Sequence, residues 1–380
     1  MGALDGVRVI ELAGIGPGPF CGMMLADMGA DVIRVDRATA VVDSDPEQPP
    51  RDVMARGRRS VGVDIKNPEG REAVLRLVES ADMCFEGFRP GVAERLGVGP
   101  EDCLARNPAL VYGRMTGWGQ EGPYSSAAGH DINYIALAGA LAHIGRADTG
   151  PVPPLNLVGD FGGGGMYLAF GMVCALVESR ASGRGQVVDA AMVDGVASLM
   201  SAFFGMMSSG FHTPERGVNL LDTGAHFYDV YQCADGEWIS LGAIEPQFYK
   251  ELLERLELDP EEFSPQHDRA QWPELKARVA EVVATRTRDG WDTVLAGTDV
   301  CYAPVLSVTE AVEHPHNIAR GTFVDIAGVV QPGPAPRLSR TPGEVRRPPA
   351  HPGQHTEEIL GEAGFDSETI LALRNSGAVA

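Results

Sequence analysis

The sequence lacks the clustered cysteines and histidines that hold a metal ion or build a disulfide scaffold. Its six cysteines are scattered along 380 residues without a Cys-x-x-Cys pair, and its nine histidines show no His-Glu-x-x-His spacing. Scattered cysteines are typical of reduced thiols in the cytosol, and zinc sites need closely spaced ligands. We therefore expect a cytoplasmic protein without a metal site.

An excess of positive charge is also absent, since the formal net charge is -21 at pH 7. Nucleic acids and anionic membranes attract basic proteins, so this balance argues against both as general partners. An anionic ligand would need a local cluster of cations.

The sequence has neither a recognisable targeting signal nor a long hydrophobic run. Asp5, Arg8 and Glu11 interrupt any signal-type apolar core at the N-terminus. The longest apolar runs, such as MYLAFGMVCALV, are shorter than the roughly 20 residues that span a bilayer. The C-terminal SGAVA is neither a peroxisomal nor a prenylation signal. We expect no membrane partner.

Strand-like and helix-like segments alternate over residues 1–120. Apolar runs typical of buried strands occupy residues 6–12, 30–37 and 60–66. Residues 67–82 are typical of a helix, with Asn67 as N-cap and Pro68 in the first turn. This alternation predicts an α/β fold with a parallel sheet covered by helices. Residues 222–314 look like a smaller unit that begins with a hairpin around an Asp-Gly turn.

The turn GIGPGP follows the first predicted strand and invites comparison with a dinucleotide-binding fingerprint. Gly14 and Gly16 fit its first two glycines, but the third position is Pro19, and Arg37 directly follows the candidate ribose-binding Asp36. The pattern favours a turn that lets a ligand approach backbone amides over a nicotinamide cofactor.

Seven basic residues lie at or near predicted strand ends or helix starts. They are Arg37, Arg56, Arg58, Arg59, Lys66, Arg89 and Arg95. The carboxyl ends of parallel strands collect the ligand of an open sheet, so the set indicates a polyanion such as a nucleotide phosphate. For any single residue, a solvated loop charge is an equal alternative.

Three candidate catalytic side chains stand at predicted helix starts. His130 in GHDINY opens an apolar helix, whose dipole favours a neutral imidazole able to accept a proton. Amides of that first turn, Asp131 among them, could hold a developing oxyanion. Asp160 precedes a run of glycines, which indicates that something lies against the backbone, and Glu245 could orient a histidine. Taken singly, each is also explained as a core histidine, an N-cap or a helix-start acid.

Several segments together resemble the family III CoA-transferase superfamily, and within it the α-methylacyl-CoA racemases. The specific ones are GHDINYIALAGALAHIG and PLNLVGDFGGGGMYLAFG, and the resemblance covers essentially the whole chain. It implies a Rossmann-like large domain from residues 1–205 and 315–380, a smaller α+β domain at 222–314, and a linker at 206–221. It also implies an interlocked homodimer whose active site joins one subunit's large domain to the other's small domain.

The resemblance implies an isomerase of fatty-acid metabolism that interconverts (R)- and (S)-2-methylacyl-CoA by 1,1-proton transfer through an enolate. CoA would be bound as part of the substrate, with no other cofactor. His130 and Asp160 would be the two acid/base groups, and Glu245 would partner His130. The thioester would lie against Gly129, Asp131, Ile132, Asn133 and Tyr134. CoA would contact Arg37, Val63, Asp64, Ile65, Lys66, Gly87, Phe88, Arg89 and Arg95.

The transferases of the superfamily offer an alternative. They use an aspartate, at the position that Asp160 occupies here, as nucleophile to form an acyl anhydride. They usually lack a histidine at the position of His130, so GHDINY favours the racemase.

Overall fold

The computed structural model describes residues 1–380, which divide into two compact units. The first contains Met1–Ala138, Leu155–Leu199 and Gly321–Ala380, and the second contains Gly139–Pro154 and Met200–Arg320. The first unit therefore includes both ends of the chain, and the chain passes between the units four times.

A six-stranded parallel sheet forms the centre of the first unit, in the order β3-β2-β1-β4-β5-β6. Its strands are β1 (Arg8–Leu12), β2 (Asp31–Arg37), β3 (Arg59–Val63), β4 (Met83–Glu86), β5 (Val111–Thr116) and β6 (Gln186–Ala191). This is the strand order of a Rossmann fold, which confirms the predicted α/β class. The order reverses between β1 and β4, where such folds open a crevice for a ligand.

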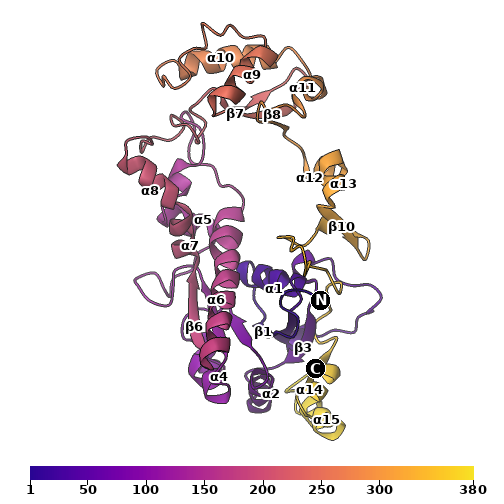
Figure 1. Cartoon of the computed structure of the whole chain (residues 1–380). Helices are drawn as coiled ribbons and strands as arrows, with labels where there is room; N and C mark the ends of the chain where they lie inside the picture. The colour runs from indigo at the N-terminus through magenta and orange to yellow at the C-terminus, as the bar shows by residue number, and fades with distance from the viewer. The chain divides into compact units, whose positions relative to one another are not determined.

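Helices and turns cover this sheet (Figure 1). Its helices are α1 (Pro17–Asp27), α2 (Pro68–Val78), α3 (Val92–Leu96), α4 (Pro100–Arg106), α5 (Asp131–Leu137), the π-helix η4 (Leu157–Gly165), α6 (Met166–Ser182), α7 (Met192–Leu199), α14 (Thr356–Glu362) and α15 (Ser367–Asn375), with 3-10 turns η1 (Ala38–Ala40) and η2 (Val53–Ala55). The predicted start of α2 is confirmed, because Asn67 Oδ1 accepts the backbone N–H of Glu69 at 3.0 Å.

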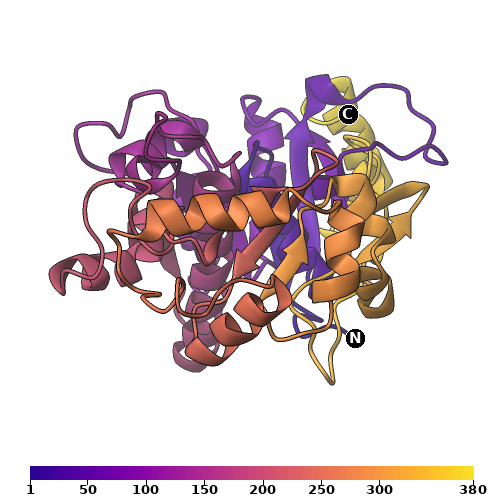
Figure 2. The same ribbon diagram turned by 90° about the horizontal axis from the view of Figure 1, so that it is seen from above.

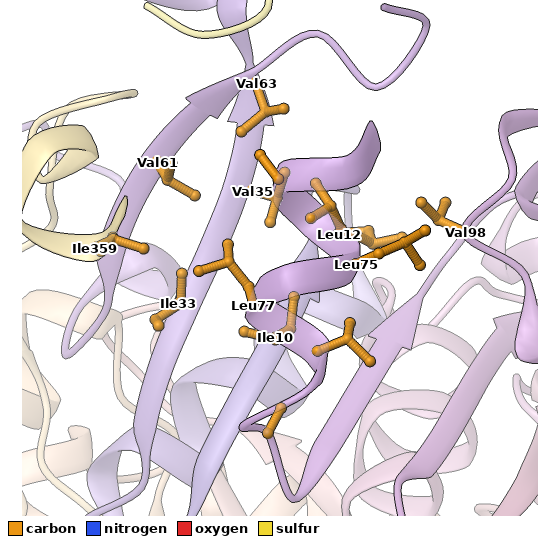
Figure 3. Packing of buried hydrophobic residues seen from close by; sticks show 14 of the residues in the cluster. Ile10, Leu12, Ile33, Val35, Val61, Val63, Leu75, Leu77, Val98 and Ile359 are labelled. Carbon is orange, nitrogen blue, oxygen red and sulfur yellow. The ribbon is translucent and has the colours of Figure 1, made fainter. Parts of the chain in front are cut away.

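Successive side chains of a strand point to opposite faces of the sheet. The sheet therefore contributes to two separate hydrophobic cores, one on each face. Ile10 and Leu12 belong to the core beneath α2 and α14, whereas Val9 packs in the core with α1 and α6. Figure 3 shows the first of these cores, in which Leu77 and Ile359 meet the strand residues. Burial on both faces explains the uninterrupted apolar runs of the sequence.

The C-terminal segment returns to the edge of the sheet formed by β3. Thr356 Oγ1 accepts the backbone N–H of Gly62 at 3.1 Å, and Arg59 forms ion pairs with Glu358 and Glu362. Figures 1 and 2 both show the yellow C-terminal helices beside the indigo N-terminal strands. A hairpin of β10 (Phe323–Ile326) and β11 (Val329–Pro332), which the sequence did not predict, precedes them.

The second unit is built around an antiparallel sheet, β7-β8-β9, with helices over it. Its elements are the 3-10 turn η3 (Leu141–His143), α8 (Ser201–Ser208), β7 (Tyr228–Gln232), β8 (Trp238–Gly242), α9 (Pro246–Arg255), α10 (Trp272–Val283), α11 (Arg288–Leu295), β9 (Tyr302–Pro304), α12 (Val308–Glu313) and α13 (Pro315–Arg320). The predicted hairpin joins β7 to β8, and Gly236 adopts a φ of 85° in its Asp-Gly turn.

The unit boundaries differ from the expected domain boundaries. Residues 139–154, 200–205 and 315–320, expected in the large domain, belong to the second unit, and so do residues 206–221, expected as a linker. The cause is a set of polar contacts. Arg146 donates to both carboxylate oxygens of Asp229 at 3.0 and 2.9 Å, and Arg216 donates to the carbonyls of Ala142 and Arg146. Asn219, which was expected in the linker, is fully buried in the second unit.

Together η4 and α6 form one helical run, Leu157–Ser182, that is long and apolar enough to cross a membrane by length and composition. Counting uninterrupted apolar residues had not predicted this run. Of its most apolar window, 44% is buried within the structure, where α6 contacts β5 and β6. Part of its apolar surface thus packs in the core of the first unit, whereas Met166, Phe170 and Val177 are exposed.

Candidate active site

A cavity of about 330 Å³ opens in the first unit at the carboxyl ends of β1, β4 and β5. The loop after β1 supplies Ile15, Gly16 and Pro17, the loop after β4 supplies residues 87–90, and the loop after β5 supplies Trp118. The cavity thus lies where the strand order reverses, which is the ligand position of doubly wound folds.

His130 and Asp160 both line this cavity. His130 is exposed and caps α5, and its backbone N–H donates to Asn133 Oδ1 at 3.0 Å. Asp160 is half-buried, and its Oδ2 accepts a hydrogen bond from Asn156 Nδ2 at 3.0 Å. The predicted helix start is confirmed for His130. Asp160 is instead the fourth residue of η4, whose N-cap is Asn156.

The glycines that follow Phe161 leave room for neighbouring helices. A Cβ atom on Gly163 would lie 2.7 Å from the Val196 side chain of α7, and one on Gly165 would lie 2.8 Å from the Phe20 ring of α1. The expectation that something lies against this backbone is therefore right, and its occupants are α1 and α7. π-Helices are rare and often occur at functional sites.

The GIGPGP turn packs against Asp160. Gly16 has a φ of 67°, and a Cβ atom built on it would lie 3.4 Å from Asp160 Oδ2. A left-handed backbone favours glycine at this position. The turn therefore brings its backbone close to a carboxylate of the cavity wall.

Two aromatic residues fix the shape of the GHDINY segment. Tyr134 donates its hydroxyl hydrogen to the carbonyl of Gly129, and its ring meets Trp118 edge-on with centroids 4.7 Å apart. A Cβ atom on Gly117 would lie 2.1 Å from the Tyr134 ring, so only glycine fits there. Burial raises the pKa of the Tyr134 hydroxyl. Gly129 and Tyr134 line the cavity, whereas Asp131, Ile132 and Asn133 do not.

Four of the seven predicted cations form neither an ion pair nor a side-chain hydrogen bond within the chain, and all four are exposed. They are Arg37, Lys66, Arg89 and Arg95. Arg37 ends β2, Lys66 follows β3 and Arg89 follows β4, so they stand at one edge of the parallel sheet. Among the other predicted CoA contacts, Gly87, Phe88 and Arg89 line the cavity, Val63 is buried, and Asp64 and Ile65 are half-buried.

The other three predicted cations are structural, which corrects the sequence interpretation. Arg56 pairs with Asp27, Arg58 pairs with Glu11, and Arg59 pairs with Asp31 and two C-terminal glutamates. Each guanidinium is at least 95% buried. Arg56 and Arg58 precede β3 and Arg59 is its first residue, so all three stand at the amino end of that strand and not at the carboxyl edge. Their long side chains turn into the core to meet carboxylates.

Glu245 belongs to the second unit, where it is the N-cap of α9 as predicted. Its side chain is exposed and makes no hydrogen bond within that unit. Its partnership with His130 stays a prediction. No group of three or more His, Cys, Asp or Glu side chains is placed to hold a metal ion.

Sequence reasoning missed Glu86, the last residue of β4. It is fully buried, its Oε1 accepts from Arg114 Nε at 3.2 Å, and its Oε2 accepts from the backbone of Phe88 in the cavity wall. Burial raises the pKa of this carboxyl to about 7, although Phe88 and Arg114 oppose the shift. An acid within an apolar strand is the signal that could have revealed it.

The chain is similar to known proteins over nearly its whole length. The sequence profile described as CoA-transferase family III matches residues 4–356. The α-methylacyl-CoA racemase of Mus musculus is 48% identical over 379 residues, or 99% of this chain and 97% of that protein. The α-methylacyl-CoA racemase of Homo sapiens is 45% identical over 376 residues, or 98% and 96%. A solved CAIB/BAIF family protein from Brucella suis superposes with a TM-score of 0.82 at 27% identity, covering 95% and 99%. The expected family and fold are confirmed.

Proposed function

The chain belongs to CoA-transferase family III and is an enzyme of its racemase branch, and from this premise we propose that it interconverts (R)- and (S)-2-methylacyl-CoA thioesters. The observation that carries the proposal is the presence of His130 and Asp160, from two different helices, in the wall of one cavity. CoA is bound as part of the substrate.

The chemistry requires two proton carriers. A proton next to a thioester carbonyl is weakly acidic, so its removal needs a base beside the carbon and a donor to the developing enolate oxygen. Inversion also requires that the new proton arrive from the opposite face, because a single group would return it to the face it left. His130 and Asp160 serve as these two groups, one accepting and the other donating in each direction.

The first turn of α5 supplies the donor to the thioester oxygen. The first N–H groups of a helix have no acceptor within the helix, and that of Asp131 stands directly after His130. An N–H placed where charge develops is among the largest contributions to catalysis of this kind. Proton transfer through an enolate changes no oxidation state and therefore calls for no redox cofactor.

The exposed cations hold the phosphates of CoA. Arg37, Lys66, Arg89 and Arg95 are free to pair with an anion, and Arg89 belongs to the cavity wall itself. Guanidinium groups bind phosphate oxygens in pairs, whereas lysine acts as a point charge.

Solvent deuterium tests the function. Each epimer of a 2-methylacyl-CoA, incubated in D2O, should gain α-deuterium and yield both epimers. His130→Ala and Asp160→Asn should lower the rate of inversion by about 10²–10⁴-fold. His316→Ala, an exposed histidine of the second unit, is the matched control. If the α-proton and configuration stay untouched, the proposal is wrong. A trapped acyl adduct on Asp160 with CoA exchange between acids would assign transferase activity instead.

We also propose that the enzyme is a cytoplasmic homodimer. Met166, Phe170 and Val177 of α6 are 45%, 70% and 66% exposed, and their spacing places them on one face of the helix. Exposed apolar patches of this kind mark interaction surfaces. Light scattering should give twice the chain mass, and Phe170→Glu should shift it toward one chain. A wild-type mass of one chain would exclude the dimer. All six cysteines are free, as in a reducing cytoplasm.

A further inference from the structure

The side chain of Asp131 reaches from one predicted proton carrier to the other. Asp131 directly follows His130 at the start of α5, and its Oδ1 accepts the backbone N–H of Asp160 at 2.7 Å. The residue is 6% exposed, so this contact lies out of water. One side chain therefore connects the backbone that carries the imidazole with the backbone that carries the carboxylate.

Gly159 allows this contact. A Cβ atom built on Gly159 would lie 2.4 Å from Asp131 Oδ1 and 2.8 Å from Asp131 Cγ. Real Cβ atoms do not come so close, so the carboxylate lies flat against the backbone of η4 because residue 159 has no side chain. The contact therefore depends on one residue of each helix, Asp131 of α5 and Gly159 of η4.

The beginning of η4 needs an acceptor from outside. The N–H groups in the first turn of a helix have no partner within it, and Asp160 is the fourth residue of η4. Asn156, the N-cap, does not supply one: it makes no side-chain capping hydrogen bond, and its Nδ2 donates to the Asp160 carboxylate. A carboxylate at a helix N-terminus is favoured both by its charge and by its hydrogen bonds. Asp131 fills this role from a neighbouring helix.

We propose that Asp131 is a positioning residue that locks Asp160 against His130 through its hydrogen bond to the η4 backbone. The inference rests on the proposed proton transfer, and it assigns to the Asp131 side chain a role separate from that of its backbone amide. The other carboxylate oxygen, Oδ2, is buried without a protein partner, so the contact with η4 is the polar attachment of this side chain. Two-carrier inversion depends on this attachment because both groups must flank one carbon atom.

Variants of Asp131 separate positioning from folding. Asp131→Ala removes the acceptor, and a displacement of about 1 Å costs roughly 10²-fold in rate. We expect inversion to fall about 100-fold while the KM for acyl-CoA changes less than about threefold. Asp131→Asn keeps an acceptor of the same shape and should stay within about tenfold of the wild type. Gly159→Ala keeps the carboxylate but displaces it, so it should reproduce the loss, and it carries the test if Asp131→Ala does not fold.

The stereochemistry of exchange supplies a readout that general destabilisation would not change. In Asp131→Ala, His130 should still exchange the α-proton of the epimer that it faces, whereas inversion needs Asp160. The ratio of exchange to inversion for that epimer should therefore rise at least about tenfold over the wild type. An unchanged ratio, or equal damage by Asp131→Asn and Asp131→Ala, would overturn the positioning role.

Amide hydrogen exchange of the peptide that contains Asp160 distinguishes this inference from the proposed function. In Asp131→Ala its protection should fall at least about tenfold, because the N–H of Asp160 loses its acceptor. Unchanged protection would overturn the inference whatever the activity. If Asp131→Ala loses this protection but the wild-type protein performs no proton transfer, the proposed function is wrong. The attachment of η4 by Asp131 would then still stand.

Discussion

The ion pair between Arg58 and Glu11 offers a quantitative test of how the cavity wall is supported. Both side chains are 1% exposed, and Arg58 Nη1 lies 2.7 and 2.5 Å from the two carboxylate oxygens. Arg58 Nη2 donates to the carbonyl of Pro19 at 2.6 Å. The pair therefore joins β1 to the first turn of α1, which follows the Gly16 turn.

The expected energies follow from desolvation. Arg58→Met leaves Glu11 buried without a cation, and breaking a buried pair in this way costs about 3–5 kcal/mol. Replacing both residues, as in Glu11→Leu with Arg58→Met, removes both buried charges together and is often close to neutral. We therefore expect the free energy of unfolding to fall by about 3–5 kcal/mol in the single variant and by about 1 kcal/mol or less in the double variant.

Urea unfolding followed by circular dichroism measures these differences, and calorimetric titration with CoA measures binding. The double variant should bind CoA within a few-fold of the wild type, because Arg58 is enclosed by Glu11 and Pro19. Arg37→Met is the matched control, since Arg37 is exposed and forms no ion pair. It should leave stability within about 0.5 kcal/mol of the wild type and weaken CoA binding.

Two results would refute this reasoning. If Arg58→Met changes the free energy of unfolding by less than about 1 kcal/mol, the buried pair does not carry the cost assigned to it. If the double variant folds but loses CoA binding, Arg58 serves the ligand, as its place among the seven predicted ligand-binding cations first suggested.

Two further predictions concern Glu86 and the packing of η4. Because burial raises the pKa of Glu86 to about 7, the native state holds a proton between pH 4.5 and 7 that the unfolded state has released. The free energy of unfolding should therefore fall by up to about 3 kcal/mol as pH rises through this window, and Glu86→Gln should lose that slope in urea titrations; an equal slope would contradict it. Gly163→Ala should lower stability by about 1–3 kcal/mol, since its Cβ would lie 2.8 Å from the backbone nitrogen of Val196, whereas Gly205→Ala, with open space around it, should raise stability by up to about 1 kcal/mol. Thermal unfolding of the two glycine variants checks this, and shifts of the same sign would count against it.

The sheet of the first unit could be predicted because its signals are local. Strands buried on both faces leave continuous apolar runs, and the predicted segment 30–37 differs from β2 by one residue. Asn67 followed by proline predicts the start of α2 from two neighbouring residues. The unit boundaries could not be predicted in this way. Arg146 belongs to the second unit because it meets Asp229, which is 83 residues away.

The same difference between local signals and long-range contacts applies to the candidate site. His130 and Asp160 follow from helix-start positions and from the family resemblance. The role of the Asp131 side chain depends on a residue 29 positions further along the chain, and the partner of Arg58 lies 47 positions earlier. A local sequence pattern spans too few residues to reveal either contact. Sequence therefore locates polar groups near the site, but only the fold decides which of them face the ligand and which face each other.

The distribution of charge leads to a physical account of how so acidic a chain can select an anionic ligand. With a formal net charge of -21, its overall field repels polyanions, so attraction must come from cations that no carboxylate neutralises. Internal arginines such as Arg56 and Arg58 are neutralised by buried acids, whereas Arg37, Lys66 and Arg89 remain exposed at the carboxyl edge of the sheet. Pairing the internal cations thus removes them from the field that a ligand meets, while Arg37, Lys66 and Arg89 keep unpaired positive charge at the edge where the cavity opens.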